Sequence, residues 1–295
     1  MLKLRYYLTG LKSIVAKTHT RLGFRPALVP AGGYGSGIQT TTGSTTTLPD
    51  NAATQPLVKA DQTIALPENV TMGLMKVEAG TFVMRAKYEE THCATLTRDF
   101  YLAQTEVTQA QWRAVMGTNP SYFKGNDLPV EKVSWNDAME FCEKLNSSGK
   151  APQGWKFTLP TETQWEYAAR GGNKSKGYRY SGSNLPDEVA WGKEYDDNSG
   201  SKTHPVGRKK ANELGLYDMS GNVFEWCLDD WADDISKLTT EFTRGNDQDG
   251  SDRAVRGDYS FSLVSGRTRN DGGSFSPGDR YSNLGFRVAL VPESY

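Results

Sequence analysis

Three helix-start signals fall between residues 108 and 164, and no comparable signal follows them. At 108–111, 134–137 and 161–164, a Thr or Ser is followed three residues later by Gln or Asp. The first hydroxyl can accept a backbone N–H of the first helical turn, and the later side chain can reach back to the cap. Gly117 and Gly171 supply the backbone freedom with which helices often end. The sequence therefore predicts three short helices in the middle of the chain.

The rest of the chain predicts strands and loops. Residues 72–84, with a turn at Ala79-Gly80, are expected to form a first pair of strands. After residue 175, short apolar runs alternate with long loops rich in Gly, Asn and Asp. The apolar residues that share one face of the second helix are Ala138, Phe141, Cys142 and Leu145. A helical middle followed by an irregular second half indicates an α+β domain.

Residues 1–70 differ in composition from the rest of the chain. Residues 31–56 are rich in Gly, Ser and Thr, as flexible linkers are. The stretch LGFRPALVP at 22–30 repeats LGFRVALVP at 284–292 in eight of nine positions. We interpret the repeat as the trace of a duplication and attach no function to it. We therefore expect an N-terminal segment with a low-complexity linker at 1–70 and one domain at 71–295.

The bulk properties exclude several classes of partner. A net charge of −1 and a pI near 6.3 give no electrostatic reason to expect nucleic acid or an anionic membrane. No apolar run approaches the roughly 18 residues of a transmembrane helix. Residues 1–17 lack the uninterrupted apolar run of a signal peptide, so we expect a cytoplasmic chain or an export signal outside this sequence. Three Cys, at 93, 142 and 227, are too few and too scattered for a disulfide framework.

The segment 258–283 omits five residue types altogether. It contains no Lys, Glu, Gln, Met or Trp, although these types make up 57 of the 295 residues, so a window of this length would hold about five of them. Ser, Gly, Asp, Arg, Tyr and Phe follow one another there without an apolar period. Tyr and Phe offer rigid contact area, and Ser, Gly and Asn adapt their hydrogen bonds, as in antibody binding loops. The composition favours a recognition surface, with a plain Gly/Ser-rich loop as the alternative.

Four longer motifs stand in order along the chain. They are LPVEKVSWNDAMEFCEKL (128–145), TLPTETQWEYAARGG (158–172), HPVGRKKANELGLYDMSGNVFEWCLDDW (204–231) and LGFRVAL (284–290). Over about 73–292 the chain resembles the formylglycine-generating-enzyme-like family, also called the sulfatase-modifying-factor domain. The resemblance implies a C-type-lectin-like fold of the formylglycine-generating-enzyme type, with a small twisted antiparallel sheet, flanking helices and extensive irregular loops.

The enzyme branches of this family need residues that this chain lacks. The resemblance implies a reactive, copper-binding Cys pair for formylglycine generation, but residues 256–287 contain no Cys. Sulfoxide synthases of the family use three His on iron, whereas His19, His92 and His204 are dispersed along this sequence. We therefore expect a non-enzymatic protein without a catalytic cofactor. A divergent oxidoreductase of the family and a sugar-binding lectin-like protein are the alternatives.

The segment also resembles that of a third branch, the variable proteins of diversity-generating retroelements. In that branch, adenine-directed mutagenesis of Asn codons yields fifteen amino acids and excludes Lys, Glu, Gln, Met and Trp. The resemblance implies a ligand-binding protein, on the cell surface or extracellular, that displays a hypervariable surface at about 256–287 to a protein or other macromolecule. RGDYSF stands where RGGSW is usual, so the register within 258–276 is open. The expected binding residues are Asp258, Tyr259, Phe261, Arg267, Arg269, Asn270, Asp271, Ser274, Phe275, Asp279, Tyr281 and Asn283.

The motif GLYDMSGNVFEW resembles the calcium loop of the family's enzymes. The ligands implied by this resemblance are the side chains of Asp218 and Glu225 and the carbonyls of Gly221 and Val223. Oxygen ligands that include two carboxylates suit a structural Ca²⁺. Alternatively, the two carboxylates cap the loop through backbone N–H groups without a metal.

The ends of the variable segment are expected to belong to the frame of the domain. We predict that Arg256-Gly257 and the stretch 284–287 are buried or hydrogen-bonded, and that Phe286 and Trp226 are core residues. The residues between these ends should form one exposed patch, so that replacing Tyr259, Phe275, Asp279 or Tyr281 by Ala changes stability little. If 281–284 form a strand, Tyr281 and Asn283 point outward while Ser282 and Leu284 point inward.

Overall fold

The computed structural model describes residues 56–85, 91–192, 200–232, 252–257 and 273–293; the N-terminal copy of the repeat lies outside them. The strands are β1 (Gln62–Ala65), β2 (Thr71–Val77), β3 (Gly80–Arg85), β4 (Thr91–Leu96), β5 (Phe100–Ala103), β6 (Trp155–Thr158), β7 (Phe224–Asp230), β8 (Arg253–Arg256), β9 (Gly273–Phe275), β10 (Leu284–Gly285) and β11 (Ala289–Pro292). The helices are α1 (Gln109–Met116), α2 (Trp135–Ser147), α3 (Glu162–Ala169) and α4 (Pro186–Val189), with 3-10 turns η1 (Pro67–Asn69) and η3 (Gly172–Lys174).

The three helices predicted from their capping signals are confirmed. Thr108, Ser134 and Thr161 each accept a backbone N–H from the residue three positions on, and the side chain of that residue accepts the N–H of the cap. Gly117 ends α1 in the left-handed conformation, with φ of 76°. The four apolar residues expected on one face of α2 are the buried residues of that helix. Local sequence therefore determines where these helices begin.

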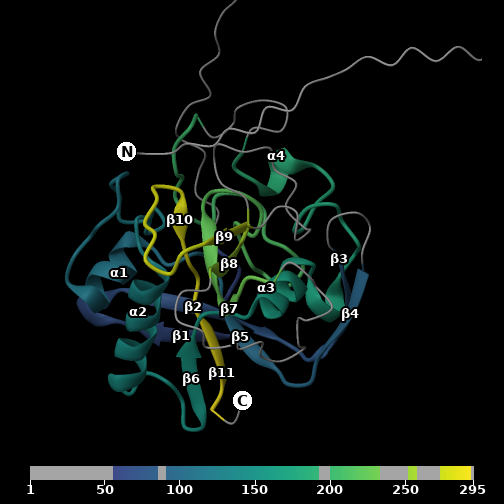
Figure 1. Cartoon of the computed structure of the whole chain (residues 1–295), viewed down its shortest axis with the longest axis horizontal. Helices are drawn as coiled ribbons and strands as arrows, with labels where there is room; N and C mark the ends of the chain where they lie inside the picture. Colours follow the sequence, from purple (N-terminus) through teal and green to yellow (C-terminus); the bar gives the residue numbers. More distant parts are fainter. Residues whose placement is uncertain (1–55, 86–90, 193–199, 233–251, 258–272, 294–295) are drawn as a thin grey trace, which may run out of the picture. The chain divides into compact units, whose positions relative to one another are not determined.

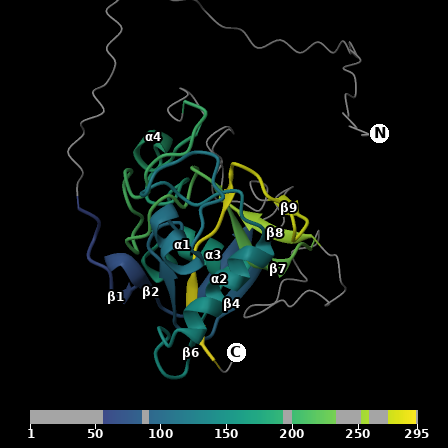
Figure 2. The same ribbon diagram turned by 90° about the vertical axis from the view of Figure 1, so that its left-hand side faces the viewer.

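A five-stranded antiparallel sheet, in the order β1-β2-β5-β11-β6, separates two apolar layers. Leu74 and Leu290 face the layer that contains α1 and α2, while their chain neighbours Met75 and Ala289 face the layer that contains α3. This alternation follows from the period of two along a strand. Figure 1 shows α1 and α2 on one side of the sheet and α3 on the other, and in Figure 2 α1 and α2 lie in front.

A second sheet, in the order β10-β7-β8-β9, carries both ends of the expected variable segment. β7 pairs with β8 antiparallel and with β10 parallel, so Glu225 of β7 lies between Arg256 and Gly285. The segment therefore leaves the sheet after β8, returns as β9, and rejoins β7 at β10. None of the helices in the described ranges has the length and apolar character needed to cross a bilayer.

Two expectations about the start of the domain are wrong. The sheet begins before residue 71, because β1 pairs with β2 over four residues. The strands on either side of Ala79 are not partners either, since β2 pairs with β1 and β5 whereas β3 pairs with β4 in a separate two-stranded sheet. At this corner a side chain on Gly80 would lie 2.2 Å from the Tyr167 hydroxyl. The small residue therefore allows the chain to pass close to α3 and turn from one sheet to the other.

Candidate functional site

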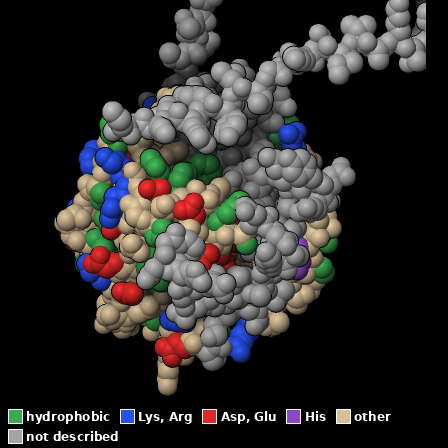
Figure 3. Space-filling view, in the orientation of Figure 1, with side chains coloured by type: hydrophobic (Ala, Val, Ile, Leu, Met, Phe, Trp, Pro, Cys, Tyr) green, Lys and Arg blue, Asp and Glu red, His purple; other side chains and the backbone are tan. Residues whose placement is uncertain are grey.

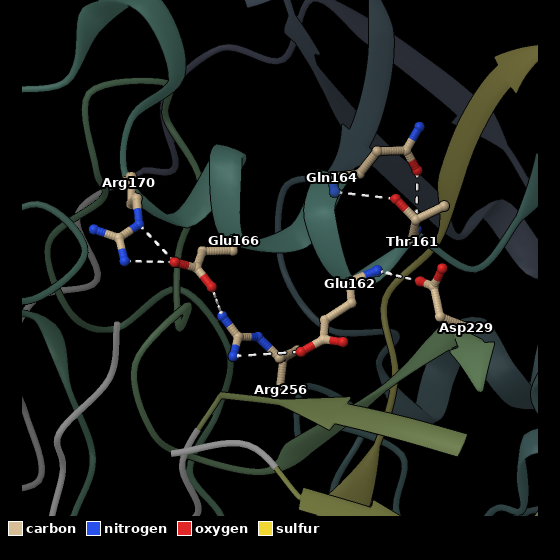
Figure 4. A network of polar contacts seen from close by, with 7 residues as sticks. All are labelled: Thr161, Glu162, Gln164, Glu166, Arg170, Asp229 and Arg256. Carbon is tan, nitrogen blue, oxygen red and sulfur yellow. Dashed lines mark hydrogen bonds and ion pairs between the residues drawn. The ribbon is translucent and has the colours of Figure 1, made fainter. Parts of the chain in front are cut away.

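The segment expected to vary begins at Arg256, whose side chain is buried. β8 places its guanidinium beside α3, where it pairs with the carboxylate of Glu166 and lies 3.8 Å from that of Glu162 (Figure 4). The Nε of Arg170 donates to the other oxygen of Glu166 at 2.8 Å. Two guanidinium groups therefore bind one fully buried carboxylate. Because an unpaired buried charge is costly, this network fixes the point at which the segment leaves the sheet.

The same network anchors the start of α3 against the second sheet. The carboxylate of Asp229 on β7 accepts the backbone N–H of Glu162, the first residue of the helix (Figure 4). The hydroxyl of the cap residue Thr161 accepts the N–H of Gln164 at 3.0 Å. A carboxylate at a helix N-terminus also interacts favourably with the helix dipole. These contacts join α3 to β7 and to β8.

The segment ends at residues 284–287, and here too an arginine is buried. The Nε and Nη2 atoms of Arg287 each donate to an oxygen of Glu225 at 2.6 Å. The remaining N–H groups donate to the carbonyls of Ala103 at 3.2 Å and Tyr217 at 3.1 Å. The planar fork of a guanidinium suits such a bidentate contact, and a lysine cannot reproduce it. The prediction that both ends of the segment are buried or hydrogen-bonded is confirmed, as is the core position of Phe286.

Between these ends, the stretch 273–283 is held by main-chain hydrogen bonds, together with side-chain contacts of Ser276 and Arg280. The N–H of Lys132 donates to the carbonyl of Tyr281 at 2.9 Å, and the N–H of Asn136 reaches the carbonyl of Pro277 at 3.5 Å. The stretch is thus attached to the loop before α2 and to the first turn of that helix. Because backbone groups are present whatever the side chain, these contacts tolerate a change of sequence.

The aromatic side chains of this stretch differ in exposure. Tyr281 is 45% exposed, and its ring lies 5.2 Å from that of Phe275. Phe275 is half-buried and packs against the core beside Trp226, with ring centroids 6.1 Å apart. The expectation that Phe275 lies in the exposed patch is met only in part, because its ring packs against the core; Ser274 and Asp279 are half-buried as well. β9 pairs with β8, and this pairing turns Phe275 toward the core layer of α1 and α2.

The strand expected at 281–284 is present only at its end, because β10 starts at Leu284. Residues 281–284 form a turn, in which the N–H of Leu284 donates to the carbonyl of Tyr281 at 3.2 Å. Tyr281 is exposed and Leu284 is buried, as expected, but Ser282 and Asn283 are both half-buried. The argument from strand alternation is therefore wrong for these two residues.

The expected binding residues divide into two groups. Ser274, Phe275, Asp279, Tyr281 and Asn283 lie together in the stretch that runs from β9 to β10. The carboxylate of Asp279 accepts the N–H of Ser276 at 3.1 Å, which closes the turn between them. The remaining candidates lie outside the described residues, and they are Asp258, Tyr259, Phe261, Arg267, Arg269, Asn270 and Asp271.

The expected calcium loop contains an excess of buried carboxylates. Asp218 and Glu225 lie in the loop and at the start of β7, and Glu106 lies close to both; all three are buried. Arg287 is the buried cation beside them. Burial raises the pKa of Asp218 to about 6. Burial and the charge of Asp218 raise the pKa of Glu106 well above its usual range. One guanidinium thus faces three carboxylates, which favours a further cation or a bound proton.

The donor chemistry of this loop fits a hard cation at Asp218. Its Oδ2 accepts the N–H of Gly207 at 2.6 Å, while its Oδ1 is buried without a hydrogen-bond partner. The carboxylate of Glu225 already accepts hydrogen bonds from Arg287 and from the indole N–H of Trp165, so only its remaining lone pairs could bind a metal. Within the described ranges, no three His, Cys, Asp or Glu side chains are grouped so as to hold a metal. A metal here would need main-chain oxygens, as the expected carbonyls of the loop provide.

The cysteines of the described residues are not arranged as reactive thiols. Cys142 and Cys227 are fully buried, and Cys93 on β4 is exposed and free. Burial first, and then the charges of Glu162 and Asp229, raise the pKa of Cys227 well above its usual range. A thiol nucleophile must lose its proton, so Cys227 stays in the unreactive form at neutral pH.

Sequence reasoning missed two residues beside this surface. Tyr122, in the loop between α1 and α2, is 68% exposed and is the most exposed of the large hydrophobic side chains in the described ranges. Glu131, in the same loop, is fully buried. The sequence gives little indication of this burial, because a single acidic residue within PVEKV is typical of an exposed polar loop.

The short sheets, the flanking helices and the irregular second half define an α+β domain of the C-type-lectin-like class. Residues 59–291 match the sulfatase-modifying factor enzyme 1-like domain, and the chain belongs to this family. The resemblance expected from the four motifs is thereby confirmed.

Three relatives show how the family varies. The chain is 43% identical to the chaperone protein LppX of Paenibacillus barcinonensis, over 54% of this chain and 71% of that protein. It is 32% identical to the formylglycine-generating enzyme of Mus musculus, over 62% of this chain and only half of the enzyme. The solved structure of Treponema denticola variable protein 1 superposes with a TM-score of 0.67 and 30% identity, over 78% of this chain and 99% of that one. The family thus includes an enzyme and proteins named for other roles.

Proposed function

We propose that this protein is a non-enzymatic binding protein that recognises a macromolecular partner through the segment at about 256–287. The observation that carries this proposal is the contrast within that segment. Its ends are fixed by Arg256 and Arg287, both buried in ion pairs, whereas Tyr281 between them is exposed and held through its main chain. Such a frame keeps its shape while the side chains it displays change.

We propose further that the segment is diversified by a retroelement. The absence of Lys, Glu, Gln, Met and Trp from 258–283 supports this origin, since adenine-directed changes in Asn codons exclude these five types. The likeness to a protein named as variable supports it as well. Sequencing the source DNA downstream of codon 250 tests the origin. We expect an imperfect repeat that differs from the coding copy at adenines; a repeat with differences at all four bases would contradict it.

The proposal of a non-enzymatic role rests on the lack of a reactive thiol in this segment and at Cys227. The segment contains no Cys, and Cys227 is buried and protonated. The 43% identity to a chaperone is also compatible with binding without turnover. A divergent oxidoreductase is the alternative, supported by the identity to the mouse enzyme. Incubation with a Cys-containing sulfatase peptide and copper separates the two, because formylglycine in the peptide by mass spectrometry would overturn the binding role.

Two surface-displayed libraries test the recognition surface directly. One randomises eleven of the expected binding residues, leaving out Phe275 because its ring packs against the core, and the matched control randomises eleven frame and core residues, Phe286 and Arg287 among them. We expect most members of the first library to fold and nearly all members of the control to fail, judged by resistance to protease on the displaying cell. Selection of the first library on lysozyme as a model protein should yield binders. Equal loss of folding in both libraries would contradict the proposal.

The setting that suits this role is the cell surface or the extracellular space, where a variable surface meets varied partners. A protein, rather than nucleic acid, is the partner class that a net charge of −1 supports. Fractionation of the source cells, followed by protease treatment of intact cells, tests the location. Protection of the chain from external protease would contradict it.

We also propose a structural Ca²⁺ in the loop at Asp218, held by its carboxylate and by the carbonyls of Gly221 and Val223, with Glu225 as a further ligand. The buried Oδ1 of Asp218, which has no hydrogen-bond partner, supports this site. A ligand that binds only the folded state stabilises it, by about 2.7 kcal/mol at a hundredfold excess over the dissociation constant. We expect the melting temperature to fall on addition of EGTA and to recover with Ca²⁺, and Asp218→Asn to abolish the effect. No change with either reagent would contradict the site.

A further inference from the structure

An aromatic pair outside the segment expected to vary lies in the loop between α1 and α2. Tyr122 and Phe123 follow α1, and their rings meet edge to face with centroids 5.0 Å apart. Tyr122 is 68% exposed, and a tyrosine ring offers a large apolar area to a partner. A single exposed apolar side chain is common on a protein surface, so a binding role for Tyr122 depends on how its loop is fixed.

The loop that carries this pair is fixed by buried polar side chains. An oxygen of Glu131 accepts the N–H of Phe123 at 2.8 Å, and the hydroxyl of Ser121 accepts the N–H of Glu131 at 3.1 Å. The amide of Gln109 on α1 donates to the carbonyl of Phe123 at 2.9 Å and to that of Pro129 at 3.1 Å. The main chain of Phe123 is therefore bound on both its N–H and its carbonyl side. A loop held in this way presents Tyr122 without the entropy cost of ordering it on binding.

This loop is joined to the variable segment through the residue next to Glu131. Lys132 adopts a left-handed backbone, with φ of 58°, and its N–H donates to the carbonyl of Tyr281. Such a conformation is unfavourable for a residue with a side chain and persists where its surroundings hold it. Around this turn the side chain of Glu131 is buried and accepts the N–H of Phe123, while the side chain of Lys132 is exposed. The Tyr122 loop is therefore joined to Tyr281 by the hydrogen bond from the Lys132 N–H.

Charged side chains flank the aromatic pair in the same loop. Lys124 and Lys132 are exposed and form no ion pair with a described carboxylate, whereas the exposed carboxylate of Asp127 lies 3.9 Å from the guanidinium of Arg208. The Nζ of Lys124 donates to the carbonyl of Asn119 at 3.1 Å, which holds its charge close to Tyr122. Figure 3 shows Lys and Arg side chains, with Asp and Glu side chains among them, at the left edge, on the side of α1 in Figure 1. A partner with acidic side chains complements the two exposed lysines that have no carboxylate partner among the described residues.

We infer that Tyr122 and Phe123 form an aromatic anchor, encoded outside the diversified segment, that binds an acidic protein segment together with the residues displayed around Tyr281. The inference rests on the proposed function and deepens it. The anchor supplies contacts common to all variants of the protein, and the diversified side chains select among partners. Aromatic residues at the centre of an interface contribute most of its affinity, so the anchor keeps each variant above a basal level of binding.

Peptides selected on the wild-type protein serve as the probe. Random 12-residue peptides displayed on phage are selected on the full chain, and the recovered peptides are synthesised and titrated by fluorescence anisotropy. We expect them to be enriched in Asp and Glu, and to bind Tyr122→Ala and Tyr281→Ala at least about tenfold more weakly. Tyr122→Phe should keep most of the affinity, because the ring is retained. The matched control is Leu185→Ala, since Leu185 is 59% exposed beside α4 and should not change binding.

The outcomes separate this inference from the proposed function. If Tyr281→Ala weakens binding and Tyr122→Ala does not, the anchor is refuted while the recognition surface stands. If neither substitution weakens binding, both are refuted, because the peptides then bind elsewhere. If the wild-type chain forms a dimer in sedimentation velocity that Tyr122→Ala dissociates, the partner of the anchor is a second copy, and the inference is refuted in favour of self-association.

Discussion

Two arginines that lie seven residues apart, Arg280 and Arg287, make similar bidentate contacts in opposite environments. Arg287 is fully buried and binds Glu225 with both distances at 2.6 Å. Arg280, in the displayed stretch, binds Asp137 of α2 at 2.8 and 2.9 Å, with about half of its side chain exposed. In water the Arg280 pair is screened and contributes little, while the buried pair cannot be broken without leaving a charge in the core. We therefore expect the contact to contribute little to stability at Arg280 and a large amount at Arg287.

This contrast explains how one continuous stretch of chain can be both fixed and variable. The frame residues depend on their side chains, since Arg256 and Arg287 satisfy carboxylates that no water reaches. In the stretch between them, Tyr281 and Pro277 are held through their carbonyls, and the side-chain contact of Arg280 with Asp137 is about half exposed. We therefore expect sequence change to be costly at the two buried arginines and tolerated at the exposed positions between them.

The largest effect is expected from breaking the buried pair. Arg287→Met leaves Glu225 without its cation beside Glu106 and Asp218, and should lower the free energy of unfolding by about 3–5 kcal/mol. Arg280→Met, the matched control, should lower it by about 1 kcal/mol or less. Urea denaturation of both variants at neutral pH measures the difference. Equal losses in the two variants would contradict the view that burial makes the Arg287 pair more important for stability than the Arg280 pair.

The next largest effect is a pH dependence of the free energy of unfolding, which arises from Glu131 in the loop of Tyr122. Burial raises the pKa of Glu131 to about 7, against the opposing effects of the Phe123 N–H and of Lys124 and Lys132. The folded state then binds the proton more tightly than the unfolded chain, so the free energy of unfolding falls as the pH rises from about 4.5 to 7. A shift of this size corresponds to at most about 3 kcal/mol.

Glu131→Gln isolates this contribution. Glutamine keeps an oxygen for the N–H of Phe123 but does not titrate, so the variant should lose less stability than the wild type between pH 5 and pH 8. Urea denaturation of both proteins at the two pH values gives the comparison. Parallel losses in the two proteins would place the titration at another residue, of which Asp218 is the first to test.

The sequence predicts the buried framework of the domain better than it predicts the stretch 273–283 and the loop of Tyr122. The capping residues Thr108, Ser134 and Thr161 mark the helices because capping is a local interaction, and the motif around Phe286 identifies the family. The half-buried position of Phe275 could not be predicted, because it depends on the pairing of β9 with β8 across a loop of unspecified register. The burial of Glu131 could not be predicted either, because its partner Phe123 lies in a loop that shows no periodic sequence pattern.

A smaller effect is expected at Phe275, which lies between the two environments. Its ring contacts Trp226 on one side and Tyr281 on the other. Complete burial would make a Phe-to-Ala change cost about 3–5 kcal/mol, and partial burial should reduce the cost of Phe275→Ala to about 1–2 kcal/mol. Phe286→Ala, measured in the same way by urea denaturation, gives the upper reference. A cost at Phe275 equal to that at Phe286 would assign the residue to the frame and remove it from the recognition surface.

The smallest effect on stability is expected at the exposed tyrosines. Tyr281→Ala and Tyr122→Ala should each change the free energy of unfolding by no more than about 0.5 kcal/mol, because the bonds that hold both loops use main-chain atoms and Glu131. Binding of the selected peptides should nevertheless weaken in both variants. Differential scanning fluorimetry and anisotropy on the same samples give the two numbers side by side. A variant that loses stability and binding together would mean that its tyrosine supports the fold, whereas loss of binding at unchanged stability is the behaviour of a residue that is displayed for a partner.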